Sequence, residues 1–510
     1  MGNSCCKKRK GVMAGDDFFL EDYEIYDEFN KDNRISVIHY DLNLIVSQTK
    51  TNPYEDYNQI KKIGEGTFGT VELVEHKITG MQRAMKIIKK ANIVNPEQNN
   101  EESVLNEFNI LKKIDHPNVV KIYEFYSDAE NYYLITEYCP GGDLYEATQK
   151  EHLSEVQVAC IMYQILLALN HIHKMKIMHR DLKLENILIN KKEKDGLYRI
   201  KLCDFGTSHL FKDGEKEKNI IGSSYYIAPE VFNQNYNFKC DLWSCGIIMY
   251  VLITKKIPFV GENKKQIRNS ILKKNYIAEP LKMYSKYVQD LVNDLLQKNY
   301  EKRINAEIAL TSELFKIYKC KEVINELTKN QIINYINNIR KHKKRHAFQE
   351  TLLSYLIHNS DMDEIIGAYK LFNKFDTNQK GKISQMEFFN ALCDITKEKF
   401  NKEEVREMFL NIDTNKNNYI EPEEFVKAAV DKKIFLSEKM IKFAFNFFDK
   451  EKRGFITVED LKKIFKTNIN NDSYASEEFN KIIKSADRDE DGKIGYDEFC
   501  IFVETLLGQL

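Results

Sequence analysis

Residues 179–186 of this 510-residue chain read HRDLKLEN, which places a carboxylate, Asp181, five residues before an amide, Asn186. Phosphoryl transfer uses such a pair, because the carboxylate can orient a substrate hydroxyl and accept its proton while the amide helps to hold Mg²⁺. Lys183 lies between them, where its ammonium group can neutralise charge on the transferring phosphoryl group. Taken alone, the stretch is also an ordinary polar loop.

Two further signals follow this stretch along the chain. Residues 204–206 read DFG, and the carboxylate of Asp204 can hold Mg²⁺ between the phosphates of a nucleotide. Residues 228–230 read APE and close the segment.

Two more signals precede it. Residues 64–71 read GEGTFGTV, a strand-turn-strand pattern whose glycines let backbone amides approach phosphate oxygens. Lys86 follows on the next expected strand, where it can hold the α- and β-phosphates, and Glu107 lies in a helical stretch from which it could pair with that lysine. Each signal has an alternative as a chance turn or a solvated side chain, but five in this order favour nucleotide-dependent phosphoryl transfer. The glycines of the pattern are Gly64, Gly66 and Gly69.

The composition is that of a soluble protein with a sizeable core, since 43% of residues are hydrophobic and 30% are charged. A net charge of −1 gives no whole-chain argument for binding nucleic acid, and none is expected. The ten cysteines are scattered apart from Cys5 and Cys6, which argues against a disulfide framework and for a reducing compartment. We find neither a long apolar span nor the apolar core of a signal peptide, so we expect a cytoplasmic protein, free or held on the cytosolic face of a membrane.

The periodicity of the apolar residues divides the chain into four parts. Residues 1–56 have poor periodicity and are expected to form an extension. Residues 57–318 begin with short strand-like runs and change near Gly141 to apolar residues at helical spacing. Residues 319–360 are expected to form a junction with amphipathic helical patterns. In residues 361–510 an apolar helix followed by an Asp-led polar loop recurs four times.

Residues 57–318 resemble a eukaryotic protein kinase domain, and the resemblance covers every motif described above. It implies a bilobal fold and binding of ATP. The Lys183 position and the pair Gly222-Ser223 ahead of the APE motif resemble the serine/threonine branch of the family. By the same matching, Thr136 is the gatekeeper residue. The matched adenine-pocket residues are Ile63, Val71, Ala84 and Leu188, with the hinge from Glu137 to Cys139.

The resemblance also carries an expectation about substrates and assembly. Asp143 and Glu185 match acidic positions that receive a substrate arginine in basophilic relatives. We therefore expect protein substrates with basic residues near the target serine or threonine, and a monomeric enzyme.

The four polar loops of residues 361–510 fit the calcium-binding pattern of EF-hands. Such a loop supplies oxygen ligands at positions 1, 3, 5, 7, 9 and 12 around a tight turn at position 6. The loops begin at Asp376, Asp413, Asp449 and Asp487, with spacings of 37, 36 and 38 residues. The alternative, a set of solvated acidic turns, does not account for the fourfold repeat.

The four loops differ in their expected ligands. Loop four fits the pattern best, and loop two should also bind Ca²⁺. Loop one has Lys380 at position 5, and loop three has Arg453 there, so both are weaker candidates. Loop three also ends in an aspartate, whose shorter side chain chelates less well, which favours a structural partner or a weak site. The expected ligands are Asp376, Asn378, Lys382 and Glu387 in loop one; Asp413, Asn415, Asn417, Tyr419, Glu421 and Glu424 in loop two; Asp449, Glu451, Thr457 and Asp460 in loop three; and Asp487, Asp489, Asp491, Lys493 and Glu498 in loop four.

Four such loops in series resemble calmodulin, and a kinase domain joined to them resembles the calcium-dependent protein kinase family of plants and protists. We therefore expect an α+β chain: a bilobal protein kinase fold followed by an all-α EF-hand (calmodulin-like) domain, using ATP, Mg²⁺ and Ca²⁺. The resemblance implies that the junction occupies the catalytic cleft at rest and is withdrawn when Ca²⁺ binds. The basic run at residues 340–345, beside Phe348 and Leu352, independently fits a helix-in-groove ligand, although a plain linker helix is an alternative.

The N-terminus resembles a myristoylation signal at Gly2, with Cys5 and Cys6 as palmitoylation candidates. The basic residues 7–10 could contact anionic lipids, so two signals would act together. A structureless tail is the alternative.

Two functions from different classes remain open at this point. The motifs favour a Ca²⁺-activated serine/threonine kinase, and the alternative is a catalytically silent, calcium-responsive scaffold that keeps a kinase fold.

Overall fold

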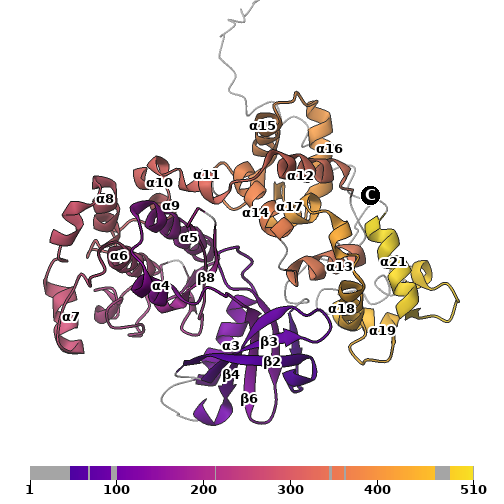
Figure 1. Cartoon of the computed structure of the whole chain (residues 1–510), viewed down its shortest axis with the longest axis horizontal. Coiled ribbons are helices and arrows are strands. Elements are labelled where there is room, and N and C mark those ends of the chain that lie inside the picture. Colours follow the sequence, from indigo (N-terminus) through magenta and orange to yellow (C-terminus); the bar gives the residue numbers. More distant parts are fainter. Residues whose placement is uncertain are drawn as a thin grey trace, which may run out of the picture. The chain divides into compact units, whose positions relative to one another are not determined.

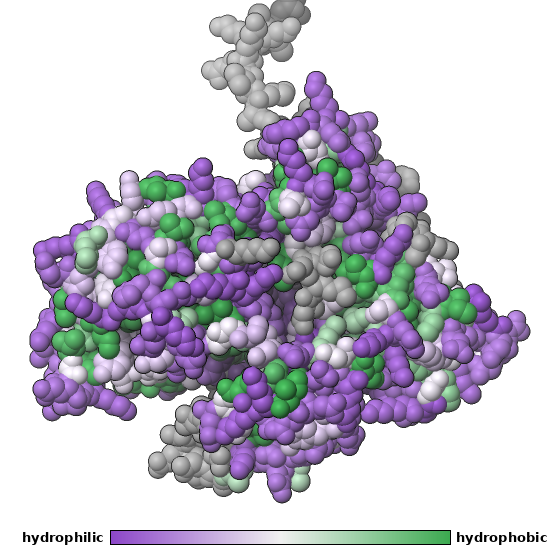
Figure 2. Space-filling model, viewed as in Figure 1, coloured by the Kyte–Doolittle hydropathy of each residue, from purple (hydrophilic) through white to green (hydrophobic). Residues whose placement is uncertain are grey.

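The computed structural model describes residues 46–66, 69–93, 100–193, 195–212, 214–343, 347–360, 363–378, 380–465, 480 and 483–508. Its elements run from a sheet through two groups of helices, as Figure 1 shows. Hydrophilic side chains cover most of the face seen in Figure 2, and hydrophobic ones form scattered groups between them.

The first lobe is built on a six-stranded sheet with the strand order β1-β5-β6-β4-β3-β2. Side chains alternate between its two faces, so Arg83 and Met85 are buried on one face while Ala84 and Lys86 lie on the other. Helix α3 (Asn100–Leu111) accompanies the sheet. The strands are β1 (Ser47–Thr49), β2 (Tyr57–Gly66), β3 (Gly69–His76), β4 (Gln82–Lys89), β5 (Ile122–Ser127) and β6 (Asn131–Glu137).

The sheet lobe begins earlier than the sequence predicted. Residues 46–56 were expected to belong to a poorly ordered extension, but Val46 is buried in the core and β1 pairs in parallel with β5. Tyr54 also donates a hydrogen bond to Glu72, at 2.6 Å. A three-residue edge strand is too short to show an alternating pattern, which is why the sequence does not reveal it.

The second lobe is helical and contains the loop of residues 179–186, which we call the catalytic loop after its proposed role. Helix α5 is fixed at its start by a capping box between Ser154 and Gln157. Helix α6 is apolar on all sides and is buried along nearly its whole length, around Trp243. The helices are α4 (Leu144–Lys150), α5 (Glu155–Lys174), α6 (Lys239–Thr254), α7 (Lys264–Lys273), α8 (Lys286–Leu295), α9 (Ala306–Ala309), α10 (Glu313–Ile317) and α11 (Cys320–Ile324), with short strands β7 (Ile177–Met178), β8 (Ile187–Lys192), β9 (Tyr198–Leu202) and β10 (His209–Leu210).

Helix α5 is also long and apolar enough to cross a membrane. It is a core helix here, since 78% of its most apolar window is buried inside the protein. Length and composition therefore do not mark it as a membrane span.

The remaining helices form the junction and the EF-hand region. Two short antiparallel pairs join neighbouring loops, β11 with β12 and β13 with β14. The junction helices are α12 (Lys329–Lys341) and α13 (Ala347–His358). The EF-hand elements are α14 (Asp363–Phe375), β11 (Ile383–Ser384), α15 (Gln385–Thr396), α16 (Lys402–Ile412), β12 (Tyr419–Ile420), α17 (Pro422–Ala429), α18 (Glu438–Phe448), β13 (Phe455–Ile456), α19 (Val458–Phe465), β14 (Ile494–Gly495) and α21 (Tyr496–Gly508).

Candidate functional site

The structure brings Lys86, Glu107 and Asp204 together, although they come from β4, α3 and the segment after β9. The Lys86 ammonium group lies 2.7 Å from the Glu107 carboxylate and 3.3 Å from that of Asp204. Although burial alone would lower the pKa of Lys86, both carboxylates hold it above its ordinary value. The lysine in turn lowers the pKa of Asp204. At neutral pH this cluster holds a fixed positive charge beside an ionised carboxylate that can bind a divalent metal.

The catalytic loop is held in place by a buried carboxylate of α6. Asp241 accepts hydrogen bonds from the backbone N–H groups of His179 and Arg180, both at 2.9 Å. Its other partner is the His173 ring, at 2.8 Å. Arg180 has a φ of 69°, an unfavourable conformation for a side-chain-bearing residue, so these bonds hold a strained turn that presents the residue after it.

Asp181 is surrounded by donors that fix its carboxylate. The backbone N–H and the hydroxyl of Ser223 both donate to one oxygen at 2.9 Å, and Lys183 donates to the other at 2.8 Å. The Asn186 amide donates to the backbone carbonyl of Asp181 at 2.8 Å. The three residues that the sequence singled out in HRDLKLEN therefore form one contact set.

Gly222 is required where the segment preceding the APE motif approaches the catalytic loop. Its φ is 113°, and a Cβ there would lie 2.8 Å from the carbonyl oxygen of Arg180. A side chain at this position would push Ser223 away from Asp181.

Phe205 is fully buried and packs against the His179 ring, with centroids 4.8 Å apart. This packing fixes the DFG segment in the orientation that turns Asp204 toward Lys86. Of the metal-binding candidates, Asn186 contacts the candidate proton acceptor Asp181 and Asp204 contacts Lys86, an arrangement that suits a metal-bound nucleotide and a hydroxyl substrate.

Several adenine-pocket candidates lie on strands that line the cleft. The Thr136 hydroxyl donates to the backbone carbonyl of Ala84 at 3.4 Å, and Glu137 pairs through its side chain with Lys201 at 2.7 Å. Val71 and Leu188 are half-buried and Ile63 is exposed on β2. Gly64, Gly66 and Gly69 lie at the ends of β2 and β3, Cys139 is buried just after β6, and Thr67 and Phe68 of the glycine-rich turn fall outside the described residues.

Two residues that position the catalytic loop were not predicted from the sequence. One is Asp241. The other is Glu217, whose carboxylate pairs with the Arg180 guanidinium at 3.0 Å. Burial would raise the pKa of Glu217, but the N–H groups of Lys218 and Asn219 and the Arg180 charge hold it below its ordinary value, so the carboxylate is ionised at neutral pH. No local pattern marks either residue, because the partners lie 37 and 61 residues apart in sequence.

We expect Glu217→Gln to lower kcat by about 10- to 100-fold, the scale of losing one partly buried charge-assisted pair of about 1.5–3 kcal/mol. The neutral amide cannot hold Arg180, so the catalytic loop loses one of its anchors. Steady-state kinetics on a peptide substrate give kcat and KM for this variant. Glu215→Gln makes the same change at an exposed position two residues earlier and should leave kcat unaltered. Equal kcat values for the two variants would contradict the assignment.

The EF-hand loops share one closed geometry. In each, both oxygens of the first aspartate accept backbone N–H groups from positions 5 and 6. Loop four also gathers Asp487, Asp489 and Asp491, each with a carboxylate oxygen within 4.8 Å of the others. Its Glu498 carboxylate accepts from the backbone N–H groups of Arg488 and Gly495. This donor set fits Ca²⁺, which prefers several carboxylate oxygens.

Loop two has the same arrangement with amide side chains in place of two carboxylates. The Glu424 carboxylate accepts from the N–H groups of Thr414, Asn415 and Glu421. Asn418 stands at the turn with a φ of 64°, which asparagine adopts more readily than most residues. Loop two therefore also fits Ca²⁺.

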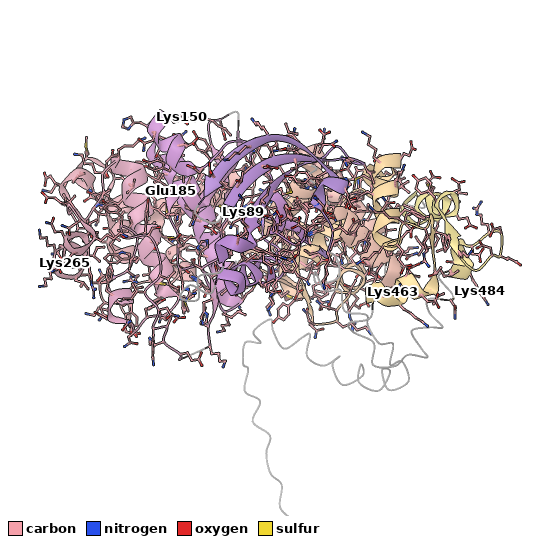
Figure 3. All side chains as sticks on the ribbon, turned by 90° about the horizontal axis from the view of Figure 1, so that it is seen from below. Lys89, Lys150, Glu185, Lys265, Lys463 and Lys484 are labelled. Atoms are coloured by element: carbon pink, nitrogen blue, oxygen red, sulfur yellow. The ribbon has the colours of Figure 1, made fainter. Side chains whose placement is uncertain are left out.

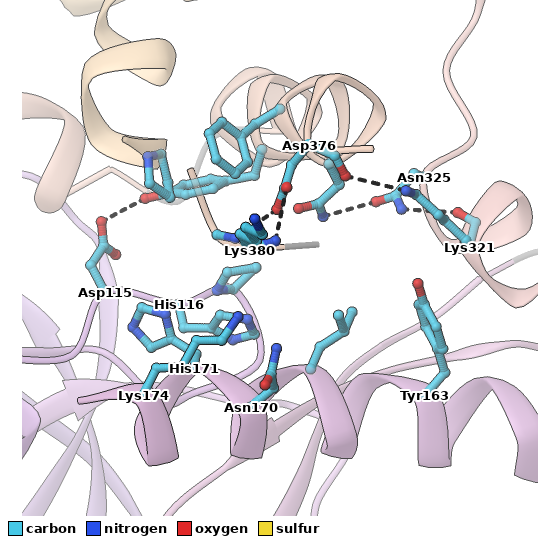
Figure 4. A pocket seen from close by; sticks show the side chains of 17 residues that line it. Asp115, His116, Tyr163, Asn170, His171, Lys174, Lys321, Asn325, Asp376 and Lys380 are labelled. Carbon is cyan, nitrogen blue, oxygen red and sulfur yellow. Dashed lines mark hydrogen bonds between the residues drawn. The ribbon is translucent and has the colours of Figure 1, made fainter. Parts of the chain in front are cut away.

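Loop one packs against the kinase lobe. The carbonyl of Asp376 accepts a hydrogen bond from Lys321 at 3.3 Å, and Tyr369 of α14 donates to Asp115 at 2.6 Å. Figure 4 shows Lys380 and Asp376 facing His171 and other residues of α5 across a pocket. The position-12 residue Glu387 accepts from Asn378 and Ser384, and Lys382 lies over the Tyr419 ring at 3.5 Å.

The junction binds to the EF-hand region. Tyr355 of α13 stacks on Phe447 and Phe443 of α18, with centroids 4.0 and 5.1 Å apart. Leu352 on the same helix is almost completely buried. On α12, the Asn338 amide donates to the carbonyl of Ala429 in α17 at 2.8 Å. Of the basic run, Arg340 pairs with Glu398. Residues 344–346 and the side chain of Phe348 lie outside the described parts.

The end of α13 docks on β4 and β5. His358 donates to the backbone carbonyl of Ile122 at 2.9 Å, and Arg83 donates to the carbonyl of Asn359 at 2.9 Å. Burial lowers the pKa of His358 to about 3, so its ring is neutral. Arg83 alternates along β4 with Ala84 and Lys86, so this contact lies on the face of the sheet opposite the one that carries the Lys86 side chain.

The two acidic residues that are expected to bind a substrate arginine differ in how free their carboxylates are to do so. Glu185 is exposed, and Figure 3 shows it on the kinase part of the chain. Asp143 caps α4 by accepting the Glu146 N–H at 2.8 Å. The lipidation candidates Gly2, Cys5 and Cys6 lie outside the described residues.

Comparisons with known proteins agree with this two-part organisation. The family described as "Protein kinase domain" matches residues 57–315, and the family described as "EF-hand domain pair" matches residues 365–430 and 438–504. The chain is 34% identical over 459 residues to calcium-dependent protein kinase 4 of Plasmodium falciparum (isolate 3D7), covering 87% of this chain and 85% of the relative. It is 32% identical over 461 residues to calcium-dependent protein kinase 33 of Arabidopsis thaliana, covering 89% of this chain and 86% of the relative.

Proposed function

The chain belongs to the calcium-dependent protein kinase family, and from that membership we propose a mechanism in which Asp181 activates the substrate hydroxyl and the junction restrains the enzyme until Ca²⁺ binds. The chain is a Ca²⁺-regulated serine/threonine protein kinase that uses ATP and a divalent metal and phosphorylates protein substrates. The expected α+β fold, a kinase domain followed by a helical EF-hand region, is confirmed. The scaffold alternative is set aside, because the chain is an enzyme of this family.

The observation that carries the mechanism is the set of contacts around Asp181. Ser223 and Lys183 hold its carboxylate in one orientation, so a hydroxyl brought to the free lone pairs is aligned and can give up its proton there. Lys183 also carries the charge that balances negative charge on the transferring group.

ATP with Mg²⁺ supplies the γ-phosphoryl group and the metal charge that neutralises the developing negative charge. Asn186 and Asp204 would hold the Mg²⁺, and Lys86, kept in place by Glu107, would hold the α- and β-phosphates. The hinge at Glu137 and Cys139 would bind adenine through its backbone, between Ile63, Val71, Ala84 and Leu188. Gly64, Gly66 and Gly69 would allow the turn to approach the phosphates.

The junction provides the calcium switch in this proposal. Its apolar side chains lie among the EF-hand helices, and its last residues dock on the face of β4 opposite the Lys86 side chain. This arrangement fits the active, Ca²⁺-bound form of the proposal, in which the EF-hand helices bind the junction and keep it out of the cleft. Without Ca²⁺ the same segment, with its basic run, would return to the cleft and block substrate. Loops two and four are the proposed Ca²⁺ sites.

The function test compares Tyr355→Ala with the wild-type chain by transfer of labelled phosphate to a basic peptide, in Ca²⁺ and in EGTA. The wild type should be active only in Ca²⁺. Tyr355→Ala removes the aromatic stack on α18, so we expect Ca²⁺-stimulated activity to fall about tenfold or more, since truncating a buried aromatic costs about 3–5 kcal/mol of packing. Ile333→Ala, at a junction side chain that is 54% exposed, is the control. Full Ca²⁺ activation of Tyr355→Ala would overturn the proposal that binding of the junction to the EF-hand helices is needed for activity.

Substrate choice and assembly follow as further parts of the proposal. Glu185 is exposed near the catalytic loop and would pair with arginine or lysine ahead of the target residue. Asp143 would accept from the same basic residue through the carboxylate oxygen that does not cap α4. The proposed enzyme is a monomer and binds no nucleic acid.

The N-terminus is proposed to anchor the enzyme to the cytosolic face of a membrane through myristate on Gly2, palmitate on Cys5 or Cys6 and the basic residues that follow. We expect Gly2→Ala to increase the soluble fraction, because it removes one of the three proposed membrane signals, and each of them alone binds a membrane only marginally. Fractionation of cells expressing each form, with Asn3→Ala as control, measures this. Membrane association of Gly2→Ala equal to that of the wild type would exclude myristate as the anchor.

A further inference from the structure

Loop three differs from the other EF-hand loops in what contacts its last ligand position. The Arg453 guanidinium, at position 5, pairs with Asp460, at position 12. The same guanidinium lies 3.6 Å from Glu451, at position 3. Positions 3 and 12, whose side chains would bind a calcium ion, are thus joined by the side-chain cation at position 5 of the same loop.

The short side chain of Asp460 explains why this pairing arises. In loop two, Glu424 reaches across the loop to the N–H groups of Thr414 and Asn415, and in loop four Glu498 reaches that of Arg488. Asp460 is one methylene shorter, and its hydrogen-bond donors besides Arg453 come from Thr457 on its own side of the loop. The longer Arg453 side chain reaches across the loop to Asp460, where the shorter aspartate does not itself reach the opposite side.

Burial makes this pairing energetically important. Asp460 is 3% exposed, and burying a carboxyl group so deeply is costly unless a charged or hydrogen-bonding partner contacts it. Arg453 supplies that partner. Glu451 is further engaged by Lys463, a residue of α19 that Figure 3 labels, so a second cation holds the position-3 carboxylate. A calcium ion entering the loop would have to displace both contacts.

Loop three is also joined directly to loop four. Strand β13 pairs with β14, with Phe455 opposite Gly495 and Ile456 opposite Ile494. The Phe455 ring lies 5.0 Å from the Arg453 guanidinium and 4.4 Å from the ammonium group of Lys493 in loop four. Closing loop three therefore orders the strand against which loop four folds.

We propose that Arg453 is a resident cation that takes the place of Ca²⁺ in loop three, closing the loop permanently and preorganising loop four for its own ion. The guanidinium supplies the positive charge that the buried Asp460 carboxylate needs, so loop three stays closed at every Ca²⁺ concentration and takes up no ion. Loop four then folds against an ordered strand and loses less conformational freedom when it binds. The effect on loop four rests on the proposed Ca²⁺ site there, whereas the closure of loop three does not.

The first test measures stability without calcium, in the full-length chain. In EGTA, Arg453→Ala should lower the midpoint of thermal unfolding of the EF-hand region by about 3–6 °C, the scale expected when one buried charge loses its partner. Lys452→Ala removes the same charge from the neighbouring residue, whose ammonium group pairs outside the loop with Asp56. Equal midpoints for the two variants would overturn the resident-cation role, whether or not loop four binds Ca²⁺.

The second test counts calcium ions by isothermal titration of the full-length chain. Asp449→Ala should leave the stoichiometry of the wild type unchanged, because loop three holds none. Arg453→Asn combined with Asp460→Glu restores oxygen ligands at positions 5 and 12 and should add one ion per chain. Loss of one ion in Asp449→Ala, or no added ion in the double variant, would overturn the proposal.

The third test measures the coupling to loop four. Arg453→Ala should raise the Ca²⁺ concentration that half-saturates loop four by about tenfold, whereas Arg453→Lys, which keeps a shorter cation, should give a smaller rise. If Arg453→Ala does not fold, the Arg453→Lys value decides, since an affinity equal to that of Lys452→Ala would overturn the coupling. The Ca²⁺-binding step that is lost in Glu498→Gln is the step that belongs to loop four. If no step is lost in this variant, loop four is not a Ca²⁺ site, and that result is distinct from a failure of the coupling.

Discussion

Asp181→Asn is expected to lower kcat by about 10²–10⁴-fold, the usual contribution of a general base. The amide has nearly the same shape, but it cannot take a proton from the substrate hydroxyl. It also exchanges one acceptor oxygen for a donor, so the Ser223 and Lys183 contacts that fix the side chain are partly lost. KM for ATP and the thermal midpoint should change little, because the proposed nucleotide contacts lie on Lys86, Asp204 and the hinge.

Asp290→Asn is the matched control, since it makes the same change at an exposed position of α8. Rapid-quench or steady-state phosphorylation of one peptide gives kcat for both variants and for the wild type. Turnover of Asp181→Asn at the wild-type rate would remove this residue from the mechanism.

The second large effect concerns the calcium sites. Glu498→Gln and Glu424→Gln should each raise the Ca²⁺ concentration for half-maximal activity by about tenfold or more, because a bidentate ligand loses its charge at a cost of about 1.5–3 kcal/mol. Asp460→Asn should have a smaller effect on this concentration, because it removes no proposed calcium ligand and its amide oxygen can still accept a hydrogen bond from Arg453, so loop three stays closed.

Glu490→Gln serves as the control for these variants, because it makes the same change within loop four at position 4, which supplies no ligand. Activity measured over a series of buffered Ca²⁺ concentrations gives the half-maximal value for each variant. An Asp460→Asn effect as large as that of Glu498→Gln would show that the ranking of the loops is wrong.

The sequence predicted those parts of the site that are local in the chain. Asp181, Lys183 and Asn186 lie within six residues, so their spacing alone limits how they can be arranged. The EF-hand loops are local for the same reason. Lys86, Glu107 and Asp204 are distant from one another, and the sequence brought them together only through the resemblance to a known domain. The structure then places all three within contact distance.

Contacts without a local signature could not be predicted. Glu217 and Asp241 are ordinary acidic residues in sequence, and only the folded chain brings them to the Arg180 turn. Arg453 was predicted as an unfavourable residue at a ligand position. Its partner Asp460 also departs from the pattern, and the two departures compensate each other only in three dimensions, which a position-by-position reading of a motif does not detect.

The docking of α13 on β5 has a consequence for inhibitor binding. Ile122, whose carbonyl accepts the His358 hydrogen bond, lies opposite the gatekeeper Thr136 in the β5–β6 register. The junction therefore contacts the strand that pairs with the one carrying Thr136, a residue of the proposed adenine pocket. Thermodynamic linkage is reciprocal, so if calcium shifts the junction between docked and undocked forms as proposed, any ATP-competitive compound that binds the two forms unequally must shift the affinity for calcium by the same factor by which calcium shifts the affinity for the compound. Dose–response curves for such compounds are therefore defined only at a stated free calcium concentration.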